Sequence, residues 1–305
     1  VINLAFLLIK EIMGMIKKYN LIKRKSILSL LFLVVISGCS PIVSNVTNNL
    51  ASNLTTAVLN QSDPEIVRDG APAYLLLLDS FIAGNPANPS VLSSAADLYA
   101  SYAGIFVEDD SRSKILSKRA LNYSKQALCL IYKSSCQWSS YSYDDYVSNL
   151  KDIKPKYAEF ILTYSISSLV YIRAHSEDWN AIARLPHIEA SLEHYLKITP
   201  NKGNLDSVYT YLGILSTLRP PALGGDFEKG KMYFEKAIDF SDGDNLSAKV
   251  EYAIGYARPL YDRELHDQLL NEVISSDPLK ENYTLINVLA IKQAQNLIET
   301  ADDYF

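Results

Sequence analysis

One stretch in the second half of the chain limits the fold more than any other, namely Arg219-Pro220-Pro221-Ala222-Leu223-Gly224-Gly225-Asp226. Apolar and small residues recur at helical spacing on both sides of it, at Val208, Tyr211, Leu212, Leu215 and Leu218 and then at Phe227, Gly230, Phe234, Ala237 and Ile238. The prolines cannot continue the first helix, the glycines allow the backbone to turn, and Asp226 is a suitable N-cap for the second helix. The stretch therefore predicts two amphipathic helices that fold back on each other.

The spacing inside this hairpin is that of a tetratricopeptide (TPR) repeat, where small residues let two helices approach and an aromatic residue fills the gap. Leu212-Gly213 lies in the first helix, and Gly230, Phe234 and Ala237 follow in the second. The match is degenerate, because the loop is longer than a TPR turn and Gly230 stands where Ala is usual. A second degenerate copy follows the spacing of Ala120, Ser124 and Ala127.

No sustained alternation of apolar and polar residues occurs along the chain, and Pro, Gly or Asp interrupts it at intervals of a helix pair. Ser62-Asp63-Pro64-Glu65 predicts one helix start, and Ala71-Pro72 predicts the opening of another. The fold class expected is all-α, an α-solenoid of degenerate TPR-like helical hairpins in which each hairpin covers its neighbour's apolar face.

The loop of the central hairpin is a candidate functional segment, since loops longer than a connection needs are often functional. Arg219, Gly224, Gly225 and Asp226 form this candidate ligand or interface loop. Arg219 offers donors that could pair with a carboxylate or cap helix carbonyls, and the glycines allow another surface to approach closely. The alternative is structural: Arg219 caps its own helix, Asp226 caps the next, and the loop fills a gap in the solenoid.

The N-terminal region has the pattern of an export signal. Five basic residues precede an apolar run from Ile27 to Ile36, which ends in Ser37-Gly38-Cys39. The run is shorter than the roughly 20 residues that span a bilayer, and its ending fits a bacterial lipobox, so Cys39 is expected to carry the lipid. An ordinary secretory signal with an incidental cysteine is the alternative.

We expect three segments: a lipoprotein signal peptide at 1–38, a lipidated tether and first helix at 39–61, and a TPR-like helical domain at 62–305. Residues 1–14 fit the signal poorly, because Lys10-Glu11 interrupts a second apolar piece. We interpret them as an over-extended start, with Met13 or Met15 as an ordinary one, or else as an unusually long n-region. Ser40 after the cysteine favours export to the outer membrane in Gram-negative lipoproteins.

Charge and motifs exclude several classes of function. Residues 1–38 hold six of the 29 basic residues and one of the 34 acidic ones, which leaves a net charge of −10 for the remainder. Such a surface disfavours nucleic acid and anionic lipid. The four histidines, His175, His187, His194 and His266, form no metal-ligand spacing, and no nucleophile elbow, P-loop or dinucleotide fingerprint occurs. The sequence thus predicts no enzyme, no cofactor and no metal site.

Cys129 and Cys136 are the other two cysteines, and in an exported chain they can oxidise. Seven residues along one helix would separate them by about 10.5 Å, so a disulfide requires Cys136 to lie off the helix that carries Cys129. The Ser134-Ser135 break permits this. A disulfide and two free thiols both remain open.

The chain resembles the T-component (TatT) family of tripartite ATP-independent periplasmic (TRAP) transporters. The matching residues are Tyr211-Leu212-Gly213, Arg219-Pro220, Leu223-Gly224-Gly225-Asp226, Tyr233-Phe234-Glu235-Lys236-Ala237-Ile238, Lys249-Val250-Glu251-Tyr252-Ala253, Tyr256-Ala257-Arg258, Asp262-Arg263-Glu264-Leu265 and Ala301-Asp302-Asp303-Tyr304-Phe305. Asp69-Gly70-Ala71-Pro72-Ala73-Tyr74-Leu75 and the lipobox extend the resemblance over nearly the whole mature chain.

The resemblance implies a periplasm-facing lipoprotein that forms a ring-shaped homotrimer and docks the solute-binding P subunit of the transporter. It also implies a hydrophobic small ligand that passes through a central opening. The 21 tyrosines suit such apolar yet wet surfaces. A TPR-type scaffold lipoprotein for envelope assembly, with no solute role, is the alternative function.

Overall fold

The computed structural model describes residues 56–199 and 205–305. The expected signal peptide, Cys39 and most of the 39–61 segment lie outside the described residues. Residues Val58–Phe305 form one compact unit. Within the described residues the secondary structure consists of helices and the turns between them, with no strand, so the all-α prediction is confirmed.

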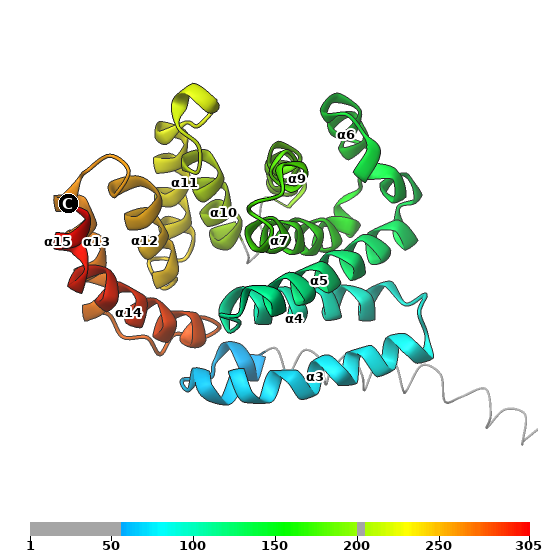
Figure 1. The fold of residues 1–305 in the computed structure, drawn as a ribbon, viewed down its shortest axis with the longest axis horizontal. Helices are drawn as coiled ribbons and strands as arrows, with labels where there is room; N and C mark the ends of the chain where they lie inside the picture. The colour runs from blue at the N-terminus through cyan, green and yellow to red at the C-terminus, as the bar shows by residue number, and fades with distance from the viewer. Residues whose placement is uncertain (1–55, 200–204) are drawn as a thin grey trace, which may run out of the picture. The chain divides into compact units, whose positions relative to one another are not determined.

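The helices follow one another with short connections (Figure 1). The α-helices are α3 (Pro64–Gly84), α4 (Pro89–Ile105), α5 (Asp110–Ile131), α6 (Tyr143–Leu150), α7 (Ala158–Ala174), α8 (Trp179–Ile182), α9 (Leu185–Ile198), α10 (Leu205–Thr217), α11 (Phe227–Phe240), α12 (Leu246–Tyr252), α13 (Arg263–Ser275), α14 (Thr284–Glu299) and α15 (Ala301–Tyr304). Three 3-10 segments are η1 (Lys133–Ser140), η2 (Pro155–Tyr157) and η3 (Pro221–Leu223), and η4 (Ala253–Ala257) continues α12 as a π-helix.

The prediction that a separate helix opens at Ala71-Pro72 is wrong. Asp63 caps α3 by accepting a hydrogen bond from the Glu65 amide, as expected, but α3 then runs through Pro72 instead of ending there. The proline removes one backbone hydrogen bond, which costs about 3 kcal/mol in a helix interior. Burial of Val67 and Leu75 on the face that also carries Ala71 offsets this cost.

Helices that are neighbours in the sequence pack in pairs, α4 with α5, α7 with α9, α10 with α11 and α12 with α13. The first helix of each pair also contacts the neighbouring pair, since α4 touches α7 and α10 touches both α9 and α12. The central hairpin is therefore confirmed as α10 and α11, joined by a loop that contains η3.

Aromatic side chains fill much of the core. One cluster surrounds Trp138 and Tyr146 beneath α7 and α9, and another surrounds Phe234 between α11 and α12. The Tyr146 hydroxyl reaches Ser191 at 2.5 Å, and the Tyr99 hydroxyl donates to Asp79 at 2.7 Å. Such tyrosines pack between helices and hydrogen-bond through their hydroxyl groups, a structural role that differs from lining a surface for a ligand.

Candidate functional site

The loop between α10 and α11 is fixed by contacts at both of its ends. The amide of Asp226 donates to the Ser216 carbonyl at 2.8 Å, and its carboxylate accepts from the Lys229 amide at 2.9 Å. Asp226 therefore caps α11, as the sequence predicts. At the other end the Arg219 guanidinium lies 3.4 Å from the Glu189 carboxylate of α9, so Arg219 pairs with a carboxylate rather than with the end of its own helix.

The two glycines have different surroundings. Gly224 has a φ of +85° and nothing within 4 Å of a Cβ placed on it, so it serves the turn and faces open space. A Cβ on Gly225 would lie 1.6 Å from the Arg219 carbonyl oxygen. Gly225 thus permits a close approach within the loop itself, not to a second surface.

Lys229 joins the same cluster from the first turn of α11. Its ammonium lies 3.0 Å from Glu189 and 2.8 Å from Glu193, both on α9. Desolvation lowers the pKa of Lys229, but the hydrogen bonds and charges of the two glutamates outweigh it and raise the pKa above its ordinary value. Two cations and two carboxylates are thus paired between α9, the loop and α11, and this network holds the central hairpin against the pair before it.

Close helix packing in the hairpin depends on residues without side chains. A Cβ on Gly213 would lie 2.7 Å from the fully buried ring of Phe234, and one on Gly230 would lie 2.4 Å from the Thr217 methyl group. The small and aromatic residues that the sequence singles out therefore meet one another across the α10–α11 contact.

A second group of polar side chains gathers where α4, α7, α10 and α12 meet, and sequence reasoning missed it. The Tyr211 hydroxyl interacts electrostatically with Glu251, Arg173 and Asp97, one from each of the other three helices. Thr163 donates to the Asp97 carboxylate at 3.1 Å. We call these five residues the Tyr211 recess.

The recess combines contact with water and strong desolvation. Asp97 is exposed and Glu251 and Tyr211 are partly exposed, yet desolvation raises the pKa of Asp97 to about 7, against the hydrogen bond from Thr163 and together with the charge of Glu159. Desolvation also raises the pKa values of Glu251 and Tyr211. Partial exposure to water and desolvation of the charged form therefore occur together at Asp97 and Glu251.

The recess offers both hydrogen-bond donors and acceptors. Tyr211 and Arg173 can donate, Glu251 can accept, and Asp97 can do either near pH 7. Arg173 also donates to the Gly104 carbonyl at 2.5 Å, which fixes it at the C-terminal ends of α4 and α7. The arrangement is suited to holding a small polar group and contains no paired nucleophile and base. No local motif marks it, because its members come from helices far apart in the sequence.

Cys129 and Cys136 are bridged in the structure, with 4.7 Å between their Cα atoms. Cys129 lies in the last turn of α5, whereas Cys136 lies in η1. The chain leaves α5 at Tyr132, and this change of direction brings the two sulfurs together.

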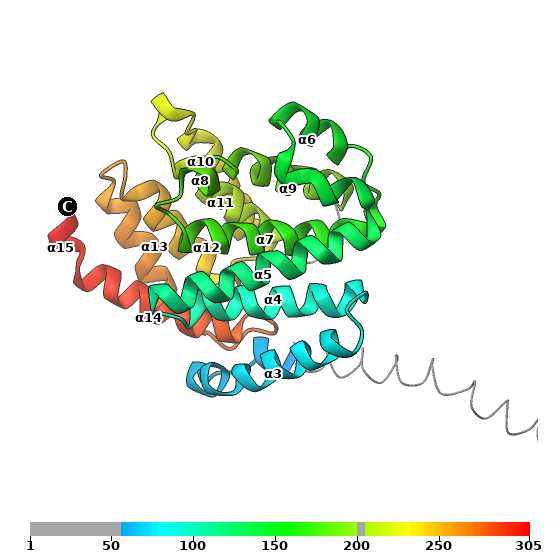
Figure 2. The ribbon, with the colours of Figure 1, turned by 45° about the vertical axis from the view of Figure 1, so that its right-hand side comes forward.

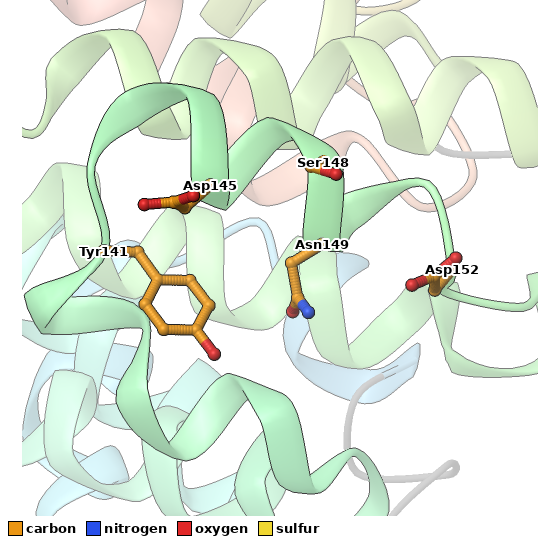
Figure 3. Close-up of a pocket in the computed structure, with 5 residues that line it drawn as sticks. All are labelled: Tyr141, Asp145, Ser148, Asn149 and Asp152. Atoms are coloured by element: carbon orange, nitrogen blue, oxygen red, sulfur yellow. The ribbon is translucent and has the colours of Figure 1, made fainter.

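A shallow pocket of about 350 Å³ lies beside α6 and is lined by Tyr141, Asp145, Ser148, Asn149 and Asp152 (Figure 3). Two of its polar side chains are engaged within the protein. Asn149 accepts from the Trp138 indole at 2.7 Å, and Asp145 accepts from the Ser142 hydroxyl at 2.7 Å. We assign it no ligand.

His266, one of two buried histidines, has a packing role. The ring of His266 accepts from the Arg258 guanidinium at 3.2 Å and contacts Asp267 at 2.8 Å. Over residues 56–199 and 205–305, no group of three or more His, Cys, Asp or Glu side chains is arranged to hold a metal ion. Within those ranges no helix has both the length and the apolar character needed to cross a bilayer.

Comparison with known proteins gives one family. The family model described as "TRAP transporter T-component" matches residues 60–305, which include both the central hairpin and the Tyr211 recess. No curated protein matches the chain. Cys39 lies outside both the matched and the described residues.

Proposed function

Because this chain belongs to the TRAP transporter T-component family, we propose that it docks the transporter's solute-binding P subunit from a lipid-anchored position on the periplasmic side of the outer membrane. Membership makes it an accessory component of a TRAP transporter. The observation that carries the proposal is the family match over residues 60–305, nearly the whole compact unit. The lipobox at Cys39 supports the anchored position.

The helical pairs form, in this proposal, a TPR-like α-solenoid. Contacts of α10 with the pair on each side support it, as does the packing of Gly213 and Gly230 against the facing helix. The protein assembles into a homotrimeric ring, as the family resemblance implies. Sedimentation of the domain without its lipid should then give the mass of three chains, and a strict monomer would contradict the ring.

A small hydrophobic ligand, if one passes through the protein, would make its polar contacts in the Tyr211 recess. Solvent contact and mixed donors and acceptors at Tyr211, Asp97 and Glu251 support this placement. The ligand would then carry at least one hydrogen-bonding group beside its apolar part.

The test is direct binding of the cognate P subunit, measured by calorimetry with the full chain in mild detergent. We expect a dissociation constant in the micromolar range or tighter. A chain that ignores its P subunit at high micromolar concentration would favour the TPR-type scaffold for envelope assembly instead.

A further inference from the structure

The turns within successive helical pairs lie along one edge of the unit. Arg173 at the end of α7 donates to the Gly104 carbonyl at the end of α4, which brings those two ends together. The end of α10 lies close against η4, since a Cβ on Gly255 would lie 3.0 Å from the Thr217 hydroxyl. In Figure 2 the turns after α4, α7, α10 and η4 point to the same side of the ribbon.

We name this surface the turn edge and define it as residues 105–109, 175–184, 218–226 and 258–262. Each of its four turns exposes at least one large apolar side chain, namely Ile105, Trp179, Leu218, Leu260 or Tyr261. Trp179 is 81% exposed and Leu218 is 57% exposed. A tryptophan this exposed contributes little to the core, whereas tryptophan and tyrosine are enriched at the centres of protein interfaces.

Acidic side chains surround these apolar ones because the N-caps of helices lie in the turns. Each turn contains an aspartate that caps a helix, Asp109 for α5, Asp178 for α8, Asp226 for α11 and Asp262 for α13. Glu108 and Glu177 add two further charges. Three arginines also lie in these turns, Arg184, Arg219 and Arg258, but each is partly buried and bonds within the protein. The turn edge is thus a row of apolar side chains with a mainly acidic rim.

We propose that the turn edge is the surface that binds the P subunit, an inference that rests on the proposed function. The charge pattern selects a partner with an apolar patch and a basic rim. A second copy of this chain, placed edge to edge, would set aspartates against aspartates, and an anionic lipid surface would repel the same rim. The partner is therefore a different protein, and the P subunit is the partner already named in the proposed function.

The experiment compares Trp179→Ser and Leu218→Ser with the control Leu279→Ser. Leu279 is 63% exposed and lies in the connection from α13 to α14, away from the turns. The next residue, Lys280, pairs with Asp244 beside the N-terminus of α12. Full-length chains in mild detergent are titrated with the cognate P subunit, and circular dichroism checks the fold of each.

We expect each turn-edge variant to weaken P-subunit binding at least about tenfold, with the Leu279 variant unchanged. If the unaltered chain binds and both turn-edge variants bind equally well, the turn edge is not the docking surface, while the proposed function stands. If the unaltered chain does not bind, both proposals fail. Loss of self-association in the turn-edge variants with P-subunit binding retained would also overturn the inference, because the edge would then be an interface between copies.

Discussion

The guanidinium of Arg219 lies 3.4 Å from the carboxylate of Glu189, so the loop after α10 is tied to α9, the second helix of the preceding pair. Both side chains are partly buried, and Glu189 also pairs with Lys229 at 3.0 Å. The loop is therefore held by a network that reaches across two helical pairs.

We expect Arg219→Ala to lower the free energy of unfolding by about 1 kcal/mol, since the pair is only partly buried and Glu189 keeps Lys229 as a partner. Urea unfolding measures this change. Lys231→Ala is the control, because Lys231 makes only an exposed 4.0 Å pair with Glu235. An unchanged free energy of unfolding would refute the structural role of Arg219. Weaker P-subunit binding at an unchanged melting temperature would instead place Arg219 in the docking surface.

Gly213→Ala should destabilise the protein by about 1–3 kcal/mol, because its Cβ would overlap the buried Phe234 ring and force one helix to move. Gly104→Ala is the same change in the last turn of α4, where the Cβ would meet its nearest neighbour at 3.5 Å. We expect that variant to be as stable as the original chain or up to about 1 kcal/mol more stable. Equal effects of the two changes in thermal unfolding would contradict the packing described for α10 and α11.

The disulfide between Cys129 and Cys136 closes a short loop, for which chain entropy gives a stabilisation of about 2.5 kcal/mol. Cys136→Ser should lower the free energy of unfolding by up to that amount, and a reducing agent should affect the original chain but not the variant. Peptide mapping by mass spectrometry with and without reduction checks the bond itself. Two alkylatable thiols in protein isolated from the oxidising compartment would show that it does not form.

Cys39 is the predicted lipid attachment residue, so Cys39→Ala should move the protein out of the membrane fraction. The reason is that the apolar run from Ile27 to Ile36 is shorter than the roughly 20 residues that span a bilayer. Fractionation and the mass of the N-terminal peptide measure the change, with Cys136→Ser as a control that keeps Cys39. A Cys39→Ala protein that stays membrane-bound and is processed as before would remove the anchor assignment.

Local signals made the central hairpin predictable. Pro220 and Asp226 each act within a few residues, by stopping one helix and capping the next, and the structure ends α10 and begins α11 there. Pro72 misled the same reasoning, because burial along α3 against α4 is a tertiary effect that outweighs the local cost of a proline.

The candidate sites were harder to predict because they depend on packing. Arg219 and Glu189 are 30 residues apart, and no spacing rule links them. The Tyr211 recess draws Asp97 and Glu251 from helices separated by more than half of the described chain. In contrast, the capping aspartates of the turn edge can be read from the sequence, although which side chains stay exposed beside them cannot.

The pKa of Asp97 gives a pH-dependent prediction. Desolvation raises that pKa to about 7 in the folded protein, with Glu159 and Tyr211 nearby and Thr163 as the hydrogen-bond donor, whereas an unfolded aspartate titrates near its ordinary value of about 4. Between these two values the folded state binds more protons, so the contribution to stability is complete below about pH 4 and is lost as the pH rises through about 7.

Asp97→Asn cannot ionise and should therefore flatten the pH dependence of stability in this window and unfold at a higher temperature than the original chain at pH 8. Because Asp97 touches water, we expect a gain of only about 1 kcal/mol, or about 2–4 °C in melting temperature. Thermal unfolding from pH 5 to pH 8 measures it, with Asp145→Asn as a control on the exposed surface of α6. Parallel pH profiles for the Asp97 variant and the original chain would mean that Asp97 ionises in the folded protein as it does in water.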